Sequence, residues 1–277
     1  SGKFETMHEA WISIEKSNIS YRSVRNFNKF RMFYGFNKKP VETEFYVNDS
    51  LLFFETLPAK NQLCESSWNF EKSINNLRIV FKGYDSPDVY ALSLDNNKGI
   101  ALDNIPLRGS SGTDFTKTDL NFMKEMYNQL NVKLIIMQFG VNVVPHIVKS
   151  YAYYEQSFYR QLVVLKKMNP NIPIIVIGVS DMSRKVNGHY ASYPNIKKIR
   201  TAQKNAAFKA GCAFWDMYEA MGGENSMPSW VFAQPPLAQK DFTHFSYKGS
   251  SIIAQMFYNA LMYEYSNYLK QQPADAK

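Results

Sequence analysis

The residues best suited to chemistry in this sequence are Asp241 and His244, which stand three positions apart within residues 240–249. A carboxylate three residues before a histidine, where a loop meets a helix, can hold the imidazole in one tautomer. The other ring nitrogen is then free to act as a general base. The same spacing also arises in ordinary loop and helix-cap contacts. The pair therefore predicts half of a catalytic triad only if other segments supply the remaining parts.

Two upstream loops could bind a developing negative charge. Residues 107–113 read Leu-Arg-Gly-Ser-Ser-Gly-Thr, and residues 138–142 read Gln-Phe-Gly-Val-Asn. Glycine lets a backbone N–H approach a substrate closely, and an asparagine amide donates a hydrogen bond without a charge. Two such donors together with a His–Asp pair are the parts of acyl-transfer chemistry, and only the nucleophile is missing. Arg108 could bind an anionic group of the substrate, although a structural ion pair is the commoner role.

Structural roles compete with these assignments. Gly109 would suit any tight turn, and Asn142 could end a strand or approach a helix cap. The phenylalanines beside Asp241 and His244 should partly bury that pair, and buried polar groups need partners. The combination of all three segments favours a catalytic site over three unrelated turns.

Residues 1–98 predict an all-β domain. Short runs of aromatic and β-branched residues are separated by Asn, Asp, Gly and Pro, and apolar and polar residues alternate in several of them. This alternation is typical of half-buried strands in a β-sandwich. The expected strands are residues 30–36, 44–47, 51–55, 77–82 and 89–94.

Residues 99–277 change to apolar strands that alternate with helices, which is typical of a parallel α/β sheet. Ligands bind such sheets at the carboxyl ends of the strands. We expect the three loops that carry the candidate site residues to meet there. The continuous apolar run 132–139 predicts a fully buried strand. The expected strands are residues 100–105, 132–139, 173–179 and 212–216, and the expected helices are residues 117–131, 146–168, 195–210 and 247–269.

These loops resemble motif blocks of the SGNH (GDSL-type) hydrolase superfamily. Its members carry a Gly-Asp-Ser block, a Gly block, a Gly-x-Asn block and an Asp-x-x-His block. Residues 108–112 resemble the second block, residues 140–142 the third, and Asp241 with His244 the fourth, in the family order. The resemblance covers about residues 99–265.

The resemblance implies a flavodoxin-like parallel sheet with flanking helices and a serine esterase mechanism. His244 would be the base, Asp241 its orienting carboxylate, and the Gly109 N–H and Asn142 the oxyanion donors. One position departs from the pattern, because Val143 stands where the family usually has an aspartate.

The first block is missing, since no Gly-Asp-Ser occurs among the 277 residues. Some members of the superfamily, including peptidoglycan and polysaccharide O-acetylesterases, carry a β-sandwich between the first block and the rest. That order fits a sandwich over residues 1–98 followed by a hydrolase domain over residues 99–277. We therefore expect the serine on a strand upstream of Ser1, and that segment would be needed to complete the sheet. Ser110 or Ser111 is the competing candidate, because each lies in a glycine-flanked turn.

The implied function is removal of O-acetyl groups from a polysaccharide. Such a substrate favours a periplasmic or secreted location. Two alternatives remain open. The chain could be a carbohydrate-binding protein that uses its β-rich domain and carries a degenerate hydrolase domain, or it could be an O-acetyltransferase that uses the same residues.

The composition of the chain limits which binding partners and cofactors we expect. The net charge of +8 comes from 32 Lys and Arg against 24 Asp and Glu, but the basic residues are scattered and no nucleic-acid-binding motif accompanies them. No apolar run approaches the roughly 20 residues needed to span a bilayer. The four histidines lack metal-ligand spacing, so we expect no metal and no other cofactor. Cys64 and Cys212 fall in different predicted domains, which argues against a disulfide.

Overall fold

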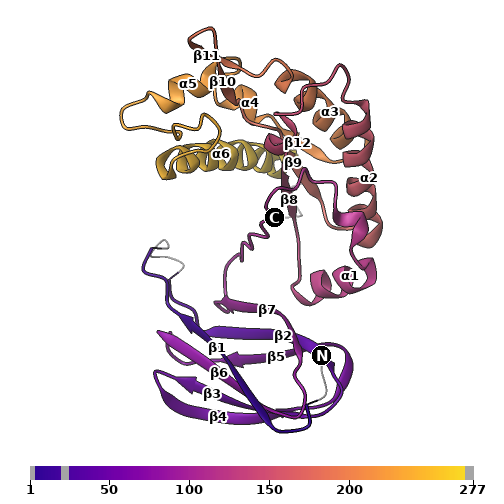
Figure 1. Ribbon diagram of the computed structural model, residues 1–277, viewed down its shortest axis with the longest axis vertical. Coiled ribbons are helices and arrows are strands. Elements are labelled where there is room, and N and C mark those ends of the chain that lie inside the picture. The colour runs from indigo at the N-terminus through magenta and orange to yellow at the C-terminus, as the bar shows by residue number, and fades with distance from the viewer. Residues whose placement is uncertain (1–3, 20–24, 272–277) are drawn as a thin grey trace. The chain divides into compact units, whose positions relative to one another are not determined.

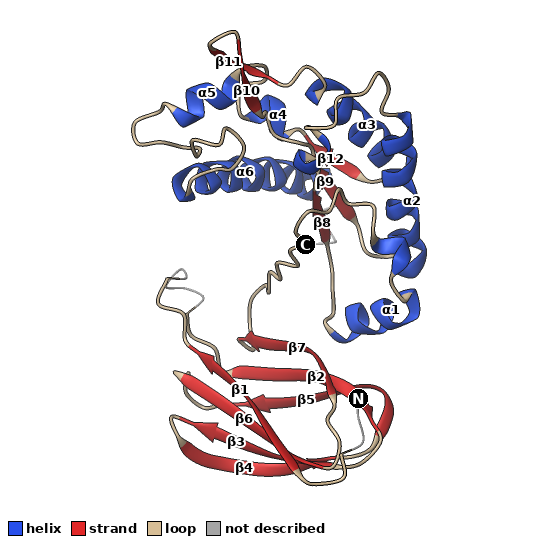
Figure 2. Ribbon diagram, viewed as in Figure 1, coloured by secondary structure: helices blue, strands red, loops and turns tan. Residues whose placement is uncertain are grey.

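The computed structural model describes residues 4–19 and 25–271 and divides into two compact units, Ser1–Ile105 and Pro106–Lys277 (Figure 1). The first unit is built of strands and the second of strands and helices (Figure 2). Residues 99–105 group with the first unit, whereas the sequence analysis began the second domain at residue 99.

The first unit contains two antiparallel sheets. One has the strand order β1-β6-β3-β4 and the other the order β5-β2-β7. The strands expected around residues 30, 44, 51, 77 and 89 are all present, and two further strands, β1 and β5, were not predicted. The bounds are β1 His8–Glu15, β2 Lys29–Asn37, β3 Val41–Val47, β4 Ser50–Leu57, β5 Lys60–Asn69, β6 Asn76–Gly83 and β7 Asp88–Asp95.

One hydrophobic core joins these two sheets. Phe30 of β2 is fully buried and stacks on Trp68 of β5, and Trp68 also contacts Phe45 of β3 in the other sheet. Buried residues of β6, including Leu77 and Ile79, belong to the same cluster. Residues of both sheets therefore contribute to one buried cluster.

The second unit is organised around a three-stranded parallel sheet of order β12-β9-β8. The strands are shorter than the apolar runs that predicted them: β8 is Ile135–Gln138, β9 is Ile174–Ile177 and β12 is Ala213–Trp215. The helices are α1 Leu120–Gln129, α2 Ala152–Met168, α3 Ile196–Lys209, α4 Met217–Ala220, α5 Ser226–Val231 and α6 Tyr247–Gln271, with single 3₁₀ turns η2 Phe115–Lys117 and η3 Val141–Val143.

The two faces of β9 pack against different helices. Ile174 and Val176 belong to a core cluster shared with α2 and α3. Ile177 belongs to a second cluster with Ile253 of α6, and Trp215 of β12 contacts Phe257 of α6. Because successive side chains of a strand point to opposite faces, the sheet is a middle layer between α2 and α3 on one side and α6 on the other.

Two expectations about the start of this sheet were wrong. Residues 100–105 form no strand, and Ile100 and Leu102 are 99% and 86% exposed. The strand expected over residues 132–139 was expected to be fully buried, yet Ile136 of β8 is 38% exposed. Both corrections have one reason. Among the described residues β8 pairs only with β9 and is an edge strand, and no described strand pairs with residues 100–105.

Helix α6 is fixed at its first turn and uncovered over most of its length. A Cβ on Gly249 would lie 1.8 Å from the carbonyl oxygen of Leu237, so only glycine permits this close contact. Of its 25 residues only Gly249 and Ile253 are buried. Large apolar side chains stay exposed farther along, namely Met256, Tyr258, Leu261, Met262, Tyr263, Tyr265, Tyr268 and Leu269.

A β-hairpin that the sequence analysis did not predict follows β9. It consists of β10 Ser183–Val186 and β11 His189–Ser192, paired from Ser183–Ser192 to Val186–His189. Its two-residue turn, Asn187-Gly188, has positive φ at both positions. Asn-Gly is the preferred sequence for this tight turn because both residues tolerate the left-handed region.

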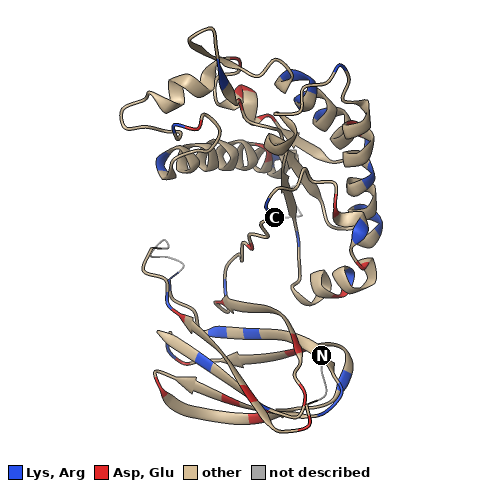
Figure 3. Ribbon diagram, viewed as in Figure 1, with Lys and Arg blue, Asp and Glu red and all other residues tan. Residues whose placement is uncertain are grey.

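Charged residues are dispersed rather than clustered. Lys and Arg lie on strands of the first unit and along the helices of the second, with Asp and Glu interspersed (Figure 3). No helix among the described residues has the length and apolar character needed to cross a bilayer.

Candidate active site

The predicted base and its carboxylate form a hydrogen-bonded pair. The Nδ1 atom of His244 lies 2.6 Å from Oδ2 of Asp241. The other carboxylate oxygen accepts the backbone N–H groups of Thr243 and His244, each at 3.0 Å. The Asp241 carboxylate is thereby fixed by its own loop, and it holds the imidazole so that Nε2 is available for proton transfer.

Both side chains are more accessible than the flanking phenylalanines suggested. The side chain of His244 is 69% exposed and that of Asp241 is 46% exposed. Partial burial opposes ionisation of Asp241, but the hydrogen bonds from the His244 ring and from the two backbone N–H groups outweigh it. Together they hold the pKa of Asp241 below its ordinary value. The carboxylate is therefore negative at neutral pH, as an orienting group must be.

Residues 237–246, which we call the base loop, are anchored on both sides of the pair. Within the loop, the Gln239 N–H donates to the His244 carbonyl oxygen at 2.8 Å. From outside it, the Ser183 N–H of the hairpin donates to the Phe242 carbonyl oxygen at 3.1 Å. Phe242 has φ of +56°, which is unfavourable for a bulky residue, and its ring stacks on Tyr190 at 3.7 Å between centroids. The hairpin thus supports the backbone between the base and its carboxylate.

Residues 107–113 and 138–142, which we call the oxyanion loops, contact each other through Asn142. Its side-chain nitrogen donates to the Ser110 carbonyl oxygen at 2.9 Å, which uses one of its two hydrogens. Gly140, just after β8, has φ of +122°, and a Cβ there would lie 2.9 Å from the side chains of both Gln203 and Val179. The turn that presents Asn142 therefore requires glycine.

Gln203 of α3 links the ends of β8 and β9, and the sequence analysis missed it. This fully buried side chain accepts the Val179 N–H at 2.9 Å and donates to the Phe139 carbonyl oxygen at 2.8 Å. It occupies the same buried helix face as Ile199 and Ala206. A glutamine on an otherwise apolar helix face is a signal that the sequence did contain, because a buried amide needs partners.

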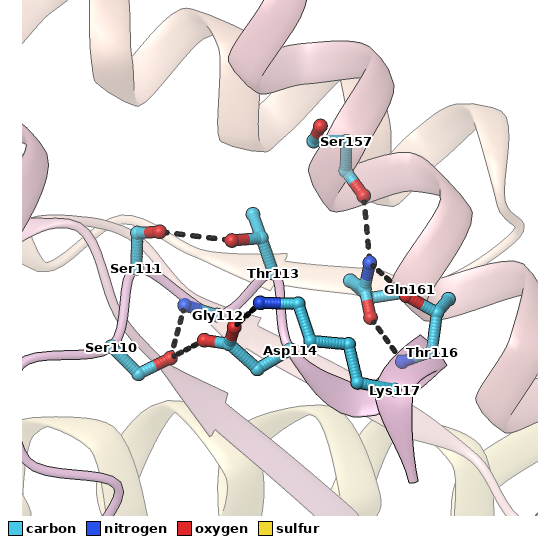
Figure 4. Close-up of polar contacts among 9 residues, drawn as sticks. All are labelled: Ser110, Ser111, Gly112, Thr113, Asp114, Thr116, Lys117, Ser157 and Gln161. Atoms are coloured by element: carbon cyan, nitrogen blue, oxygen red, sulfur yellow. Dashed lines mark hydrogen bonds and ion pairs between the residues drawn. The ribbon is translucent and has the colours of Figure 1, made fainter.

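Ser110 and Ser111 both serve their own loop. The Ser110 hydroxyl donates to Asp114 at 2.7 Å and accepts the Gly112 N–H at 3.0 Å (Figure 4). The Ser111 hydroxyl lies 3.0 Å from that of Thr113 (Figure 4). Neither contacts a base, so the geometry gives both serines a structural role in the turn.

The oxyanion loop also carries an anchored carboxylate. Hydrogen bonds from Lys117 and then from the Ser110 hydroxyl hold the pKa of Asp114 below its ordinary value. Ser110 is therefore bonded to a carboxylate rather than to an imidazole, and this arrangement fixes the start of the second motif block.

The structure places the base loop and the oxyanion loops beyond the same edge of the sheet. Gly140 and Asn142 follow the carboxyl end of β8, and the base loop bonds to Ser183, which follows the carboxyl end of β9. Among the described residues, no hydrogen bond joins the Asp241–His244 pair to Gly109 or Asn142. The base loop and the oxyanion loops therefore lie at the same edge of the sheet. A substrate and its nucleophile would have to lie between them.

The remaining predictions concern Arg108, metal binding and the two cysteines. Arg108 is exposed, and none of the ion pairs in the described part of the chain involves it. Within residues 4–19 and 25–271, no group of three or more His, Cys, Asp or Glu side chains could hold a metal ion. Cys64 and Cys212 are free thiols.

A polar cavity of about 280 Å³ opens beside the oxyanion loops. Gly109 and Asn142 line it together with His146, Tyr153 and Ser157. The proposed oxyanion donors thus face a space that a small acyl group can enter.

Comparison with known proteins supports the fold. The solved structure of a peptidoglycan O-acetylesterase aligns with 93% of this chain and 76% of its own, with a TM-score of 0.60 and 19% sequence identity. A carbohydrate esterase of family 3 from Talaromyces cellulolyticus aligns with 57% of this chain and 70% of its own, at a TM-score of 0.40 and 17% identity. An acetyl xylan esterase aligns with 56% of this chain and 77% of its own, at a TM-score of 0.40 and 15% identity.

These similarities lie at the level of fold. No protein-family model matches the sequence, and a sequence search of curated proteins found no match. The chain is similar in fold to the solved peptidoglycan O-acetylesterase.

Proposed function

We propose that this chain carries the base and the oxyanion hole of an SGNH-type serine esterase, which removes O-acetyl groups from a polysaccharide. The observation that carries the proposal is the 2.6 Å contact between His244 Nδ1 and Asp241 Oδ2, in a histidine whose side chain is 69% exposed. Fold similarity to a peptidoglycan O-acetylesterase supports the class of substrate. The finer features of the fold, a flavodoxin-like sheet and a β-sandwich, belong to the same proposal.

In this mechanism Nε2 of His244 accepts the proton of a serine hydroxyl as the serine oxygen bonds to the acetyl carbonyl carbon. The negative charge that develops on the carbonyl oxygen is stabilised by the Gly109 N–H and by the second amide hydrogen of Asn142. Collapse breaks the bond to the sugar oxygen, which takes the proton from His244. Water then loses a proton to His244 as it attacks the acetyl-serine. The bond to the serine oxygen breaks, His244 returns that proton to the serine oxygen, and acetic acid leaves and ionises to acetate. Asp241 orients the imidazole throughout and stabilises its charged form.

The serine would come from a strand paired with the open edge of β8. In the part of the chain that the structure describes, β8 has one strand neighbour, and Ile136 on it is 38% exposed. Residues 100–105 form an apolar segment that pairs with no strand among the described residues, and Ile105 is 64% exposed. An unpaired strand edge and an exposed apolar segment are both costly, and a strand inserted between them would remove both costs. The uncovered apolar side chains of α6 support the same interpretation.

Serine-reactive fluorophosphonate labelling, followed by peptide mass mapping, tests this proposal. We expect the 277-residue chain to remain unlabelled, and a polypeptide that also contains the upstream strand to be labelled on its serine and to release acetate from acetylated polysaccharide. The His244→Ala variant of the longer polypeptide should lose labelling. Labelling of Ser110 or Ser111 in the 277-residue chain would overturn the placement of the nucleophile.

A further inference from the structure

An aromatic cluster lies beside the base loop and has no role in the proposed catalytic steps. Tyr190 of the hairpin stacks on Phe242 with an interplanar angle of 15°, and Phe232, just after α5, meets both rings at 5.7 and 6.2 Å between centroids. Phe242 is buried, whereas Tyr190 and Phe232 are 39% and 64% exposed. A core cluster would bury all three rings, so two aromatic surfaces are left facing solvent next to the base.

The same residues line a cavity of about 400 Å³, which we call the aromatic pocket. Its wall combines apolar surface with a few polar groups that can hydrogen-bond. The lining residues are Tyr190, Val231, Phe232, Pro236, Ala238, Gln239, Lys240, Phe242 and Ser246. Five of them, at positions 238, 239, 240, 242 and 246, belong to the base loop and flank Asp241 and His244 along the chain. A molecule in this pocket therefore lies next to the catalytic pair.

The chemistry of the wall fits a sugar ring better than a fatty acyl chain. A pyranose ring presents one face of C–H groups, which packs on an aromatic ring, and a rim of hydroxyls that needs hydrogen-bond partners. Tyr190 and Phe232 offer the aromatic surfaces, and the Gln239 amide and the Lys240 ammonium offer polar partners. Exposed aromatic walls also suit a polymer that stays largely in water, whereas a fatty chain gains most from an enclosed site.

We propose that the aromatic pocket binds a pyranose ring of the glycan and thereby brings a neighbouring ester to His244. The proposal rests on the proposed function for the identity of that ester, but binding itself needs no nucleophile. It places sugar recognition on the second unit, whereas the carbohydrate-binding alternative from the sequence analysis placed it on the β-rich unit.

Isothermal titration calorimetry of the 277-residue chain with N-acetylglucosamine tetrasaccharide and with xylotetraose tests this proposal. We expect at least one of the two to bind, and the Phe232→Ala variant to weaken its association constant about three- to tenfold, the range for a lost aromatic contact. Phe232→Ala leaves the Tyr190–Phe242 stack in place, so the base loop should keep its conformation. The matched control is Phe208→Ala, because Phe208 on α3 is 57% exposed and lies outside the pocket lining.

The possible outcomes separate this proposal from the proposed function. Absence of binding by both sugars, or equal weakening by Phe232→Ala and Phe208→Ala, would overturn the pocket assignment. Binding of sodium octanoate that Phe232→Ala abolishes, without sugar binding, would identify an acyl-chain site and overturn it as well. Sugar binding that depends on Phe232, in a protein that never cleaves an ester even with the upstream strand, would uphold the pocket and reject the esterase.

Discussion

The base loop and the oxyanion loops of the candidate active site differ in the contacts that hold them in place. The base loop is held by contacts within itself, with the adjacent hairpin and with Trp230 of α5, and Asp241 and His244 are already paired. Of the oxyanion loops, residues 107–113 follow an apolar segment that is exposed, and residues 138–142 follow β8, which is an edge strand among the described residues. A motif whose contacts are local in sequence is assembled by the chain itself. A motif that follows a strand of a sheet depends on pairing with strands that are distant in the sequence.

The largest expected effect comes from the base loop. In a polypeptide that contains the nucleophile strand, His244→Ala should lower kcat by a factor of roughly 10⁴ to 10⁶, because no base remains to accept the serine proton. Steady-state hydrolysis of p-nitrophenyl acetate measures this. His8→Ala, an exposed histidine on β1 of the first unit, is the control and should leave kcat unchanged. A loss of less than tenfold in His244→Ala would remove His244 from the mechanism.

The second effect concerns the oxyanion loops. Asn142→Ala should lower kcat by a factor of about 100 to 1,000, equivalent to about 2.7–4 kcal/mol, with little change in KM, since an oxyanion donor acts in the transition state. The same hydrolysis assay in the longer polypeptide separates kcat from KM. Asn128→Ala, on the exposed face of α1, is the matched control. Unchanged kcat would mean that Asn142 only binds the Ser110 carbonyl.

A third change weakens the connection between the ends of β8 and β9. Gln203→Ala leaves the Val179 N–H and the Phe139 carbonyl oxygen without their partner. We expect the second unit to lose about 1–3 kcal/mol of its free energy of unfolding, the range for a buried group left unpaired. Urea denaturation followed by tryptophan fluorescence measures this, with the exposed neighbour Lys204→Ala as control. An unchanged midpoint would show that water replaces the glutamine at no cost.

The smallest expected effect is the pH dependence of the interaction between Asp241 and His244. Because the folded-state pKa of Asp241 is lowered, its interactions stabilise the loop above the ordinary aspartate value and are lost as the pH falls through the folded-state pKa. The ¹³C resonance of the Asp241 carboxyl should therefore titrate with a midpoint below the ordinary aspartate value. In His244→Ala that midpoint should rise, because the largest favourable interaction is gone. An equal midpoint in both proteins would mean that the ring does not interact with the carboxylate in solution.

The site residues could be predicted where their signal is local. The spacing of Asp241 and His244 by itself places both groups on one turn, and the structure shows them hydrogen-bonded. Gln203 and the hairpin were missed because their contribution is long-range. Gln203 acts on residues 24 and 64 positions away, although a polar residue on an apolar helix face was visible. The hairpin turn Asn187-Gly188 was visible too, but its support of Phe242 was not.

The sequence by itself determined the alternation of strands and helices in the second unit, the β-rich character of the first, and the pairing of Asp241 with His244. Periodicity and short motifs encode these features, since their physical causes act within a few residues. The tertiary structure alone decided that residues 100–105 stay exposed and that β8 is an edge. A strand is formed by hydrogen bonds to a neighbour, so an apolar run with strand propensity remains a loop where no neighbour is present.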